Sequence, residues 1–138
     1  MSNKTPVKIR VIYADTDAMG IVYHTNYIRW FEAGRSELFR DMGIIIKDAV
    51  TSGMNLPLTQ VYCHYHHPAH YDEIVTIETQ ISYVKRASIK FIYVVLNETR
   101  EMLLAEGYTV HACTDRNGNV TRIPECITEK ILSFLSNK

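Results

Sequence analysis

The spacing of hydrophobic and polar residues near the N-terminus predicts a β-strand followed by one long helix. Residues 8–13 alternate with a period of two, which is typical of a strand, and one face carries Ile9, Val11 and Tyr13. From residue 27 onward the apolar side chains return with helical spacing. The members of this stripe are Tyr27, Trp30, Phe31, Gly34, Leu38 and Met42. This pattern predicts an amphipathic helix with its apolar stripe toward a core.

The residues at both ends of this helix suit caps. Thr25 or Asn26 is placed to cap its start, and Gly43 is placed to end it. The helix would then span about 27 Å. Gly34 inside it costs about 1 kcal/mol relative to alanine. We interpret Gly34 as a point where the helix backbone approaches a sheet closely.

The remainder of the chain predicts a short connection, four strands and a last helix. Residues 44–55 are apolar but interrupted by glycine and asparagine, which predicts an irregular or short helical connection. The four strands are expected at 58–67, 74–84, 88–97 and 103–114. Short polar turns between them favour antiparallel neighbours. Pro124 can open a last helix, whose apolar side would carry Ile127, Ile131, Leu132 and Leu135.

Together these elements predict an α+β fold, with a five-stranded antiparallel sheet wrapped around one long central helix and a C-terminal helix. We expect residues 1–138 to form a single domain, because a chain of this length can bury a core alone. The strand at 88–97 is apolar on both faces, with Ile92, Val94 and Leu96 opposite the side that faces the helix. One main helix cannot cover both faces. A second subunit is the expected cover.

Composition excludes several classes of partner. Lys and Arg total 15 and Asp and Glu total 15, so nothing indicates a general affinity for nucleic acid or anionic membranes. No apolar run is long enough to span a bilayer. The three cysteines show neither a disulfide framework nor metal-type pair spacing, and no signal peptide is evident. A cytoplasmic protein is expected.

The chemistry concentrates in residues 13–27, directly before the long helix. This stretch contains two carboxylates, Asp15 and Asp17, together with Gly20 and His24. A loop that ends at a helix start places acids beside free backbone N–H groups at the positive end of the helix dipole. An acid that attacks or activates water, next to donors that hold an oxyanion, forms a minimal acyl-transfer site.

This stretch also resembles a known family. The run Asp-Thr-Asp-Ala-Met-Gly-Ile-Val-Tyr-His at 15–24, followed by Asn26 and Tyr27, is similar to the signature of the 4-hydroxybenzoyl-CoA thioesterase family of hot-dog-fold proteins, including its YbgC-type acyl-CoA thioesterases. Supporting segments are 67–69, 86–88 and 105–107. The resemblance implies a hot-dog fold, hydrolysis of acyl-CoA without a metal or redox cofactor, and homodimers, often assembled into homotetramers, with active sites between subunits.

The resemblance assigns the leading role to Asp17, the acid that acts on the thioester, either as a nucleophile or as a base that activates water. Without the resemblance, both acids would more simply order a turn, and Asp15 keeps that structural role. His24 could position water or bind the substrate carbonyl, or be an ordinary loop histidine. Gly20 lets the loop turn toward backbone donors near His24. Tyr23 and Tyr27 are expected to wall the acyl pocket or pack the core.

Two further groups of residues have alternative explanations. Arg86 and Ser88 match a segment that lies along the coenzyme A groove in relatives, although on spacing alone they are a solvated strand end. His64 and His66 would project from one strand face as metal ligands could, but no carboxylate or thiolate completes a familiar ligand spacing. We therefore predict no metal. Cys63 matches no nucleophile motif.

The leading hypothesis is an acyl-CoA thioesterase for small or medium acyl groups, aliphatic or aromatic. Acyl-carrier-protein thioesters are alternative substrates. The rival of a different class is a non-catalytic acyl-thioester binding or sensor protein on the same fold, against which the presence of Asp17 and His24 argues. A hot-dog hydratase or dehydratase is disfavoured, because the His-Phe-Pro type of active-site run expected there is absent. The identity of the acyl group depends on the shape of the pocket.

Overall fold

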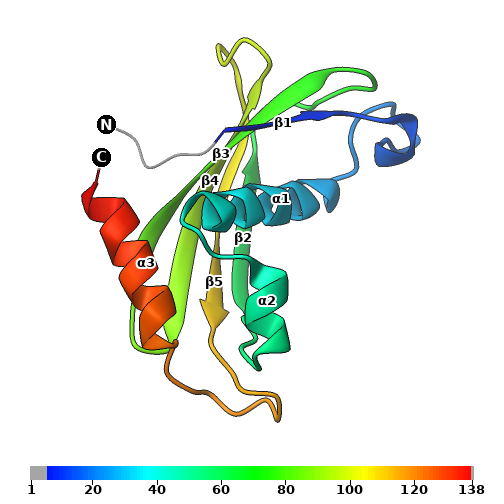
Figure 1. Cartoon of the computed structure of the whole chain (residues 1–138). Helices are drawn as coiled ribbons and strands as arrows, with labels where there is room; N and C mark the ends of the chain where they lie inside the picture. Colours follow the sequence, from blue (N-terminus) through cyan, green and yellow to red (C-terminus); the bar gives the residue numbers. More distant parts are fainter. Residues whose placement is uncertain (1–5, 138) are drawn as a thin grey trace.

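A computed structural model describes residues 6–137 of the chain, and one antiparallel sheet with α1 on one face dominates it (Figure 1). The elements in chain order are β1 (Val7–Arg10), a 3-10 turn (Tyr13–Asp15), α1 (Asn26–Asp41), α2 (Ile46–Thr51), β2 (Leu58–Tyr65), β3 (Ile74–Val84), β4 (Ser88–Asn97), β5 (Leu103–Ala112) and α3 (Glu125–Ser136). The predicted α+β class and the five-stranded antiparallel sheet around a long helix are confirmed.

The strand order in the sheet is β1-β3-β4-β5-β2, and each neighbouring pair is antiparallel. The three consecutive strands β3, β4 and β5 form the centre, because short turns connect them. β2 comes before them in sequence yet lies beside β5 at the edge of the sheet. All residues of β2 except Cys63 are exposed, so this edge has little cover from residues 6–137.

The core lies between α1 and the sheet. Alternate residues of β4 point toward the helix, where Phe91, Tyr93 and Val95 are fully buried. The ring of Tyr93 stacks on that of Phe31 from α1, with 4.2 Å between ring centroids. α3 lies on the same side of the sheet as α1 and contributes the buried Ile131 (Figure 1). The apolar stripe predicted for the central helix is therefore the face that packs into the core.

Gly34 marks the closest approach of α1 to the sheet. A Cβ atom placed on Gly34 would overlap the Oγ1 atom of Thr79 and lie 3.0 Å from the Cγ2 atom of Ile77, both on β3. Only glycine permits this approach without a shift of the strand side chains. The interpretation of Gly34 as a point of close helix–sheet contact is confirmed.

Several predicted details differ from the structure. Tyr13 is 76% exposed and belongs to a 3-10 turn, because the chain leaves the sheet after Val11. α1 begins after Thr25 as predicted, but neither Thr25 nor Asn26 caps it through its side chain; Asn26 instead donates to the carbonyl oxygen of Asp15. On α3, Leu132 is 51% exposed. Phe134 packs against the core in its place, because the helical turn carries that position inward.

Other predicted connections are as expected. Gly43 follows α1 with φ +81°, a left-handed conformation that ends the helix. Residues 44–55 contain the short helix α2, as the interrupted apolar pattern predicts. α3 begins directly after Pro124. Over residues 6–137, no helix combines the length and apolar character needed to cross a membrane.

Candidate active site

A tight loop between the 3-10 turn and α1 carries the acidic motif. Thr16 and Val22 form an antiparallel bridge, and the amide of Asp17 donates to the carbonyl of Ile21 at 2.9 Å. Gly20 closes the turn with φ +80°, and its amide donates to the carbonyl of Asp17. A residue with a Cβ atom is strained in this conformation. The loop therefore presents Asp17 at the tip of a small hairpin.

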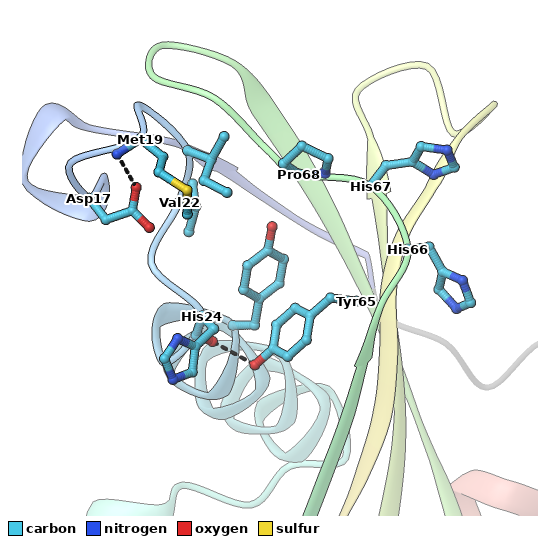
Figure 2. Close-up of a pocket in the computed structure, with 10 residues that line it drawn as sticks. Asp17, Met19, Val22, His24, Tyr65, His66, His67 and Pro68 are labelled. Atoms are coloured by element: carbon cyan, nitrogen blue, oxygen red, sulfur yellow. Dashed lines mark hydrogen bonds between the residues drawn. The ribbon is translucent and has the colours of Figure 1, made fainter.

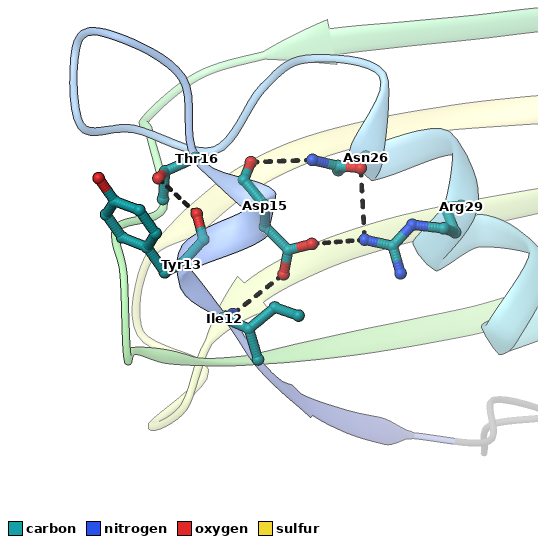
Figure 3. A network of polar contacts seen from close by, with 6 residues as sticks. All are labelled: Ile12, Tyr13, Asp15, Thr16, Asn26 and Arg29. Atoms are coloured by element: carbon teal, nitrogen blue, oxygen red, sulfur yellow. Dashed lines mark hydrogen bonds and ion pairs between the residues drawn. The ribbon is translucent and has the colours of Figure 1, made fainter.

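Asp15 fastens this loop to α1 (Figure 3). Its carboxylate accepts hydrogen bonds from Arg29 at 2.6 Å and from the amide of Ile12 at 3.0 Å. The Asp15 side chain is 6% exposed, whereas that of Arg29 is 57% exposed. Asn26 adds a hydrogen bond from its side-chain amide to the carbonyl oxygen of Asp15 at 2.8 Å. All these contacts are internal to the protein, and they support the structural role expected for Asp15.

Asp17 has a different environment. Its Oδ1 atom accepts the amide N–H of Met19 at 2.8 Å, which fixes the carboxylate in a turn. Its Oδ2 atom has no hydrogen-bond partner within residues 6–137. Asp17 and Met19 line a cavity of about 300 Å³. The carboxylate is thus held through one oxygen and offers the other for chemistry.

The same cavity extends from the loop to the end of β2 (Figure 2). Its lining residues are Asp17, Met19, Ile21, Val22, His24, Tyr27, Tyr65, His66, His67 and Pro68. The hydroxyl of Tyr65 donates to the carbonyl of His24 at 2.7 Å, and the hydroxyl of Tyr27 accepts the amide N–H of Ala69. These bonds tie the loop, α1 and the β2–β3 connection into one wall.

Burial determines what the two tyrosines can do. Desolvation by burial is the main cause that raises the pKa of Tyr27 and of Tyr65 above the ordinary value of tyrosine. Both phenols therefore stay neutral at physiological pH. Neither can serve as an anionic base, so their contribution is to shape the cavity and to hold the backbone.

The two residues directly before α1 carry potential oxyanion donors. Within the described part of the chain, the amide N–H groups of His24 and Thr25 find no acceptor, whereas those of Asn26 and Tyr27 bond to Tyr23 and His24 carbonyls. Free amides at a helix start attract negative charge. The imidazole of His24 lies against the ring of Tyr23, with 4.4 Å between centroids. Asp17 and His24 thus line one cavity, and potential oxyanion donors lie in the residues that lead into α1.

Residues 11–131 match the profile of the thioesterase-like superfamily. The chain belongs to this superfamily. Acyl-CoA thioesterase YbgC of Haemophilus influenzae is 30% identical over 119 residues, which cover 83% of this chain and 84% of the relative. The hot-dog fold and the identity of this chain as a thioester hydrolase follow from these relationships.

Two solved structures resemble this thioesterase throughout. Protein TT1821 from Thermus thermophilus has a TM-score of 0.89 and 30% identity, over 94% of this chain and 98% of its own. A variant 4-hydroxybenzoyl-CoA thioesterase, solved with 4-hydroxybenzoyl-CoA, has a TM-score of 0.84 and 22% identity, over 94% of this chain and 99% of its own. The second similarity supports the fold.

The thioesterase brings together some of the predicted site residues and separates others. Asp17, His24 and Tyr27 line one cavity. Gly20 shapes the loop but does not border the cavity, and Tyr23 is exposed beside His24. These two remain predictions as substrate-binding residues.

Arg86 and Ser88 lie at the opposite end of the sheet from Asp17. Ser88 pairs with Ala112, whereas Tyr65 of the cavity pairs with Ala105, roughly 23 Å away along β5. The carbonyl of Arg86 accepts the amide N–H of Ile123 at 2.8 Å. Within one chain these residues cannot contact the same small acyl group as Asp17. Their role in coenzyme A binding stays a prediction that would require an extended ligand or a second subunit.

The cavity also contains residues that sequence reasoning did not select. Tyr65 and Pro68 come from the end of β2 and the connection after it. The family-like segment at 67–69 was a signal for this region, but no periodicity placed Tyr65 opposite His24. Arg29 was likewise overlooked, because its partner Asp15 lies 14 positions earlier in a different type of structure.

Proposed function

We propose that this thioesterase hydrolyses acyl-CoA with a small or medium acyl group, and that Asp17 is its catalytic residue, acting as a nucleophile or as a general base. The observation that carries the proposal is the environment of Asp17, which has one oxygen fixed by Met19 and the other free at a cavity. The relative from Haemophilus influenzae is an acyl-CoA thioesterase by name. The cavity, about 300 Å³, is at the lower limit of ordinary ligand pockets, which favours a compact acyl group.

The free amides at the start of α1 would stabilise the reaction's negative charge. As water or Asp17 attacks the thioester carbon, its carbonyl oxygen becomes an oxyanion, and the N–H groups of His24 and Thr25 are the donors we assign to it. Removal of one such donor costs about 3–4 kcal/mol in characterised enzymes. The imidazole of His24 borders the same cavity and is assigned to hold the attacking water or the substrate carbonyl.

Two chemical routes are compatible with this arrangement. In one, Asp17 attacks the thioester carbon, the carbon–sulfur bond breaks, and the resulting mixed anhydride is hydrolysed by water. In the other, Asp17 takes a proton from water, which attacks the thioester directly. A single turnover in oxygen-18 water separates the direct route from attack of water on the aspartyl carbon. Label in the first product excludes that form of the covalent route, whereas label in Asp17 establishes it.

The catalytic assignment is tested by Asp17→Asn, which keeps the shape of the side chain and removes its negative charge. We expect thiol release from acyl-CoA to fall about 10²–10⁴-fold. Asp48→Asn on α2 is the control, because Asp48 is exposed and remote in sequence from the cavity residues. Equal rates for wild type and Asp17→Asn would remove Asp17 from the mechanism. Binding of acyl-CoA without thiol release by wild type would instead favour the sensor protein.

The acyl group and its carrier are tested by a substrate panel. Catalytic efficiency measured for short, long and aromatic acyl-CoA thioesters, and for the same groups on acyl carrier protein, ranks the candidates directly. We expect compact acyl-CoA thioesters to be preferred. Faster hydrolysis of long acyl chains or of acyl-carrier-protein thioesters would refute that preference.

We also propose a cytoplasmic location. The unpaired state of Cys63, Cys113 and Cys126 supports a reducing, cytoplasmic location.

We further propose a homodimer joined along β2, with a homotetramer as its further assembly. β2 is an edge strand whose Val61 and Tyr62 are each 47% exposed, which an isolated sheet edge rarely tolerates. On β4, Ile92 and Val94 remain half-buried and outside the core, which supports a second contact surface. Sedimentation velocity is the test. Val61→Lys should yield monomers, and a monomeric wild type at micromolar concentration would refute the proposal.

A further inference from the structure

Three potential metal ligands converge on the outer face of the sheet. His64 on β2 and His66, which directly follows the strand, are two positions apart, and their stacked rings lie on the same face. Glu106 on β5 is the direct register partner of His64. The Nε2 atom of His66 lies 2.8 Å from the Oε2 atom of Glu106. The sequence spacing conceals this third ligand, because strand pairing alone brings it to the histidines.

The geometry of the three side chains suits a small cation. One ligand atom from each residue can be chosen so that all lie within 4.8 Å of one another. Metal–ligand bonds of about 2.0–2.2 Å place neighbouring ligand atoms about 3.0–3.5 Å apart. The pair formed by His66 and Glu106, at 2.8 Å, lies slightly closer than this spacing and needs to separate by only a few tenths of an ångström. The ring of His64 stacks on that of His66 with 4.2 Å between centroids, so a modest side-chain rotation brings its nitrogen into range.

Within the single subunit, over residues 6–137, these three residues are accessible. His64 and His66 are exposed and Glu106 is half-buried. Lys90, a cation of the same face, lies over the ring of Tyr108 at 4.2 Å, and Arg100 pairs with Glu78 at 3.3 Å. Pairing along the edge of β2 would use backbone groups in the plane of the sheet, whereas these side chains stand out from its face. An edge-to-edge dimer therefore leaves the ligand set intact.

We propose that His64, His66 and Glu106 bind a divalent transition-metal ion, for which Zn²⁺ is the best match. Two imidazole nitrogens and one carboxylate oxygen favour zinc-like ions over Mg²⁺ and Ca²⁺, which prefer oxygen ligands. Three protein ligands leave a coordination position open for water. Because the ligands come from β2 and β5, the bound ion clamps the edge strand to the sheet. His66 also lines the cavity that Asp17 borders, but the role proposed for the ion does not involve the Asp17 carboxylate.

Co²⁺ titration followed by visible absorption tests the site. Wild-type protein, freed of metal with a chelator, should show a saturable ligand-field band at one Co²⁺ per chain, and Zn²⁺ should displace it. His64→Ala and Glu106→Gln should each weaken binding at least about tenfold. His70→Ala is the control, because His70 lies outside the ligand set, and it should bind like wild type.

Thermal unfolding provides a second, independent readout. With Zn²⁺ at about 100 times its dissociation constant, the Tm of the wild type should rise by roughly 5–10 °C, and Mg²⁺ should produce no rise. Metal-free His64→Ala and Glu106→Gln are first compared with wild type to establish that they fold. Absence of a saturable band, or equal Co²⁺ affinity in wild type and both ligand variants, would overturn the proposal and leave the hydrolase assignment untouched.

Discussion

Gly34→Ala tests the contact that positions the central helix. Alanine in a helix interior gains about 1 kcal/mol over glycine, so an unhindered site would be stabilised. Here the added methyl group would overlap Oγ1 of Thr79, a fully buried β-branched residue with little freedom to move. Overpacking of this kind costs about 1–3 kcal/mol. Because the methyl group would meet both Thr79 and Ile77, the steric cost lies at the upper end of this range, and we expect a net loss of about 1–2 kcal/mol.

Urea unfolding at a fixed protein concentration measures this loss. Trp30 is the single tryptophan and lies buried on α1, so its fluorescence reports on the helix–sheet contact. The midpoint should fall by about 0.5–1 M urea. Ser36→Ala on the same helix is the control for helix propensity and should be neutral or slightly stabilising.

A double-mutant cycle identifies the clash. Thr79→Ala removes the hydroxyl group that the methyl group added at Gly34 would meet, so the double variant should be about 1 kcal/mol more stable than the sum of the single effects predicts. If Gly34→Ala were as stable as wild type, or if Thr79→Ala brought no relief, α1 would not approach β3 as closely as described.

Three further variants examine other contacts by urea unfolding. Asp15→Asn should lose about 1–2 kcal/mol, a reduced cost for a buried carboxylate because its partner Arg29 is more than half exposed; no loss would show that the ion pair does not secure the loop. Burial lowers the pKa of His111 below 6.5, so the unfolded chain binds a proton at this residue first, and the free energy of unfolding should decline as pH falls below about 6.5. An equal decline in His111→Gln would show that another group causes it. Gly107→Ala should lose about 3 kcal/mol or more, because the new methyl group meets the backbone carbonyl of Tyr62, which cannot move aside as a side chain can. A smaller loss than for Gly34→Ala would contradict this explanation.

The sequence predicts the elements whose signals are long and periodic. The helix α1 has a complete apolar stripe, and its bounds follow the prediction closely. The first strand is shorter than predicted, because alternation continues through Tyr13 while the chain already turns. The carboxylate of Asp15 accepts the amide of Ile12 and stabilises that turn. This local hydrogen bond thus outweighs the tendency of the next two residues in the alternating pattern to continue the strand.

In the candidate site, too, the sequence predicts local contacts and misses those between segments far apart in the chain. Asp17 and His24 are neighbours in a short loop, so a sequence motif could bring them together. Tyr65 reaches His24 from 41 positions away, and Glu106 meets His66 from 40 positions away. Both contacts depend on which strand lies beside which and in what register. Hydrophobic periodicity predicts which face of a strand is buried, but it does not say which strand lies beside which.

The openness of β2 also affects how a newly made chain survives. Residues 58–65 contain no lysine, and Pro57 stands just before the strand, so the usual deterrents to false pairing are sparse along its length. Until another strand pairs with it, the edge strand β2 is a template on which any extended peptide can form backbone hydrogen bonds. The yield on refolding would therefore depend on a competition between two second-order reactions, association in the correct register and aggregation.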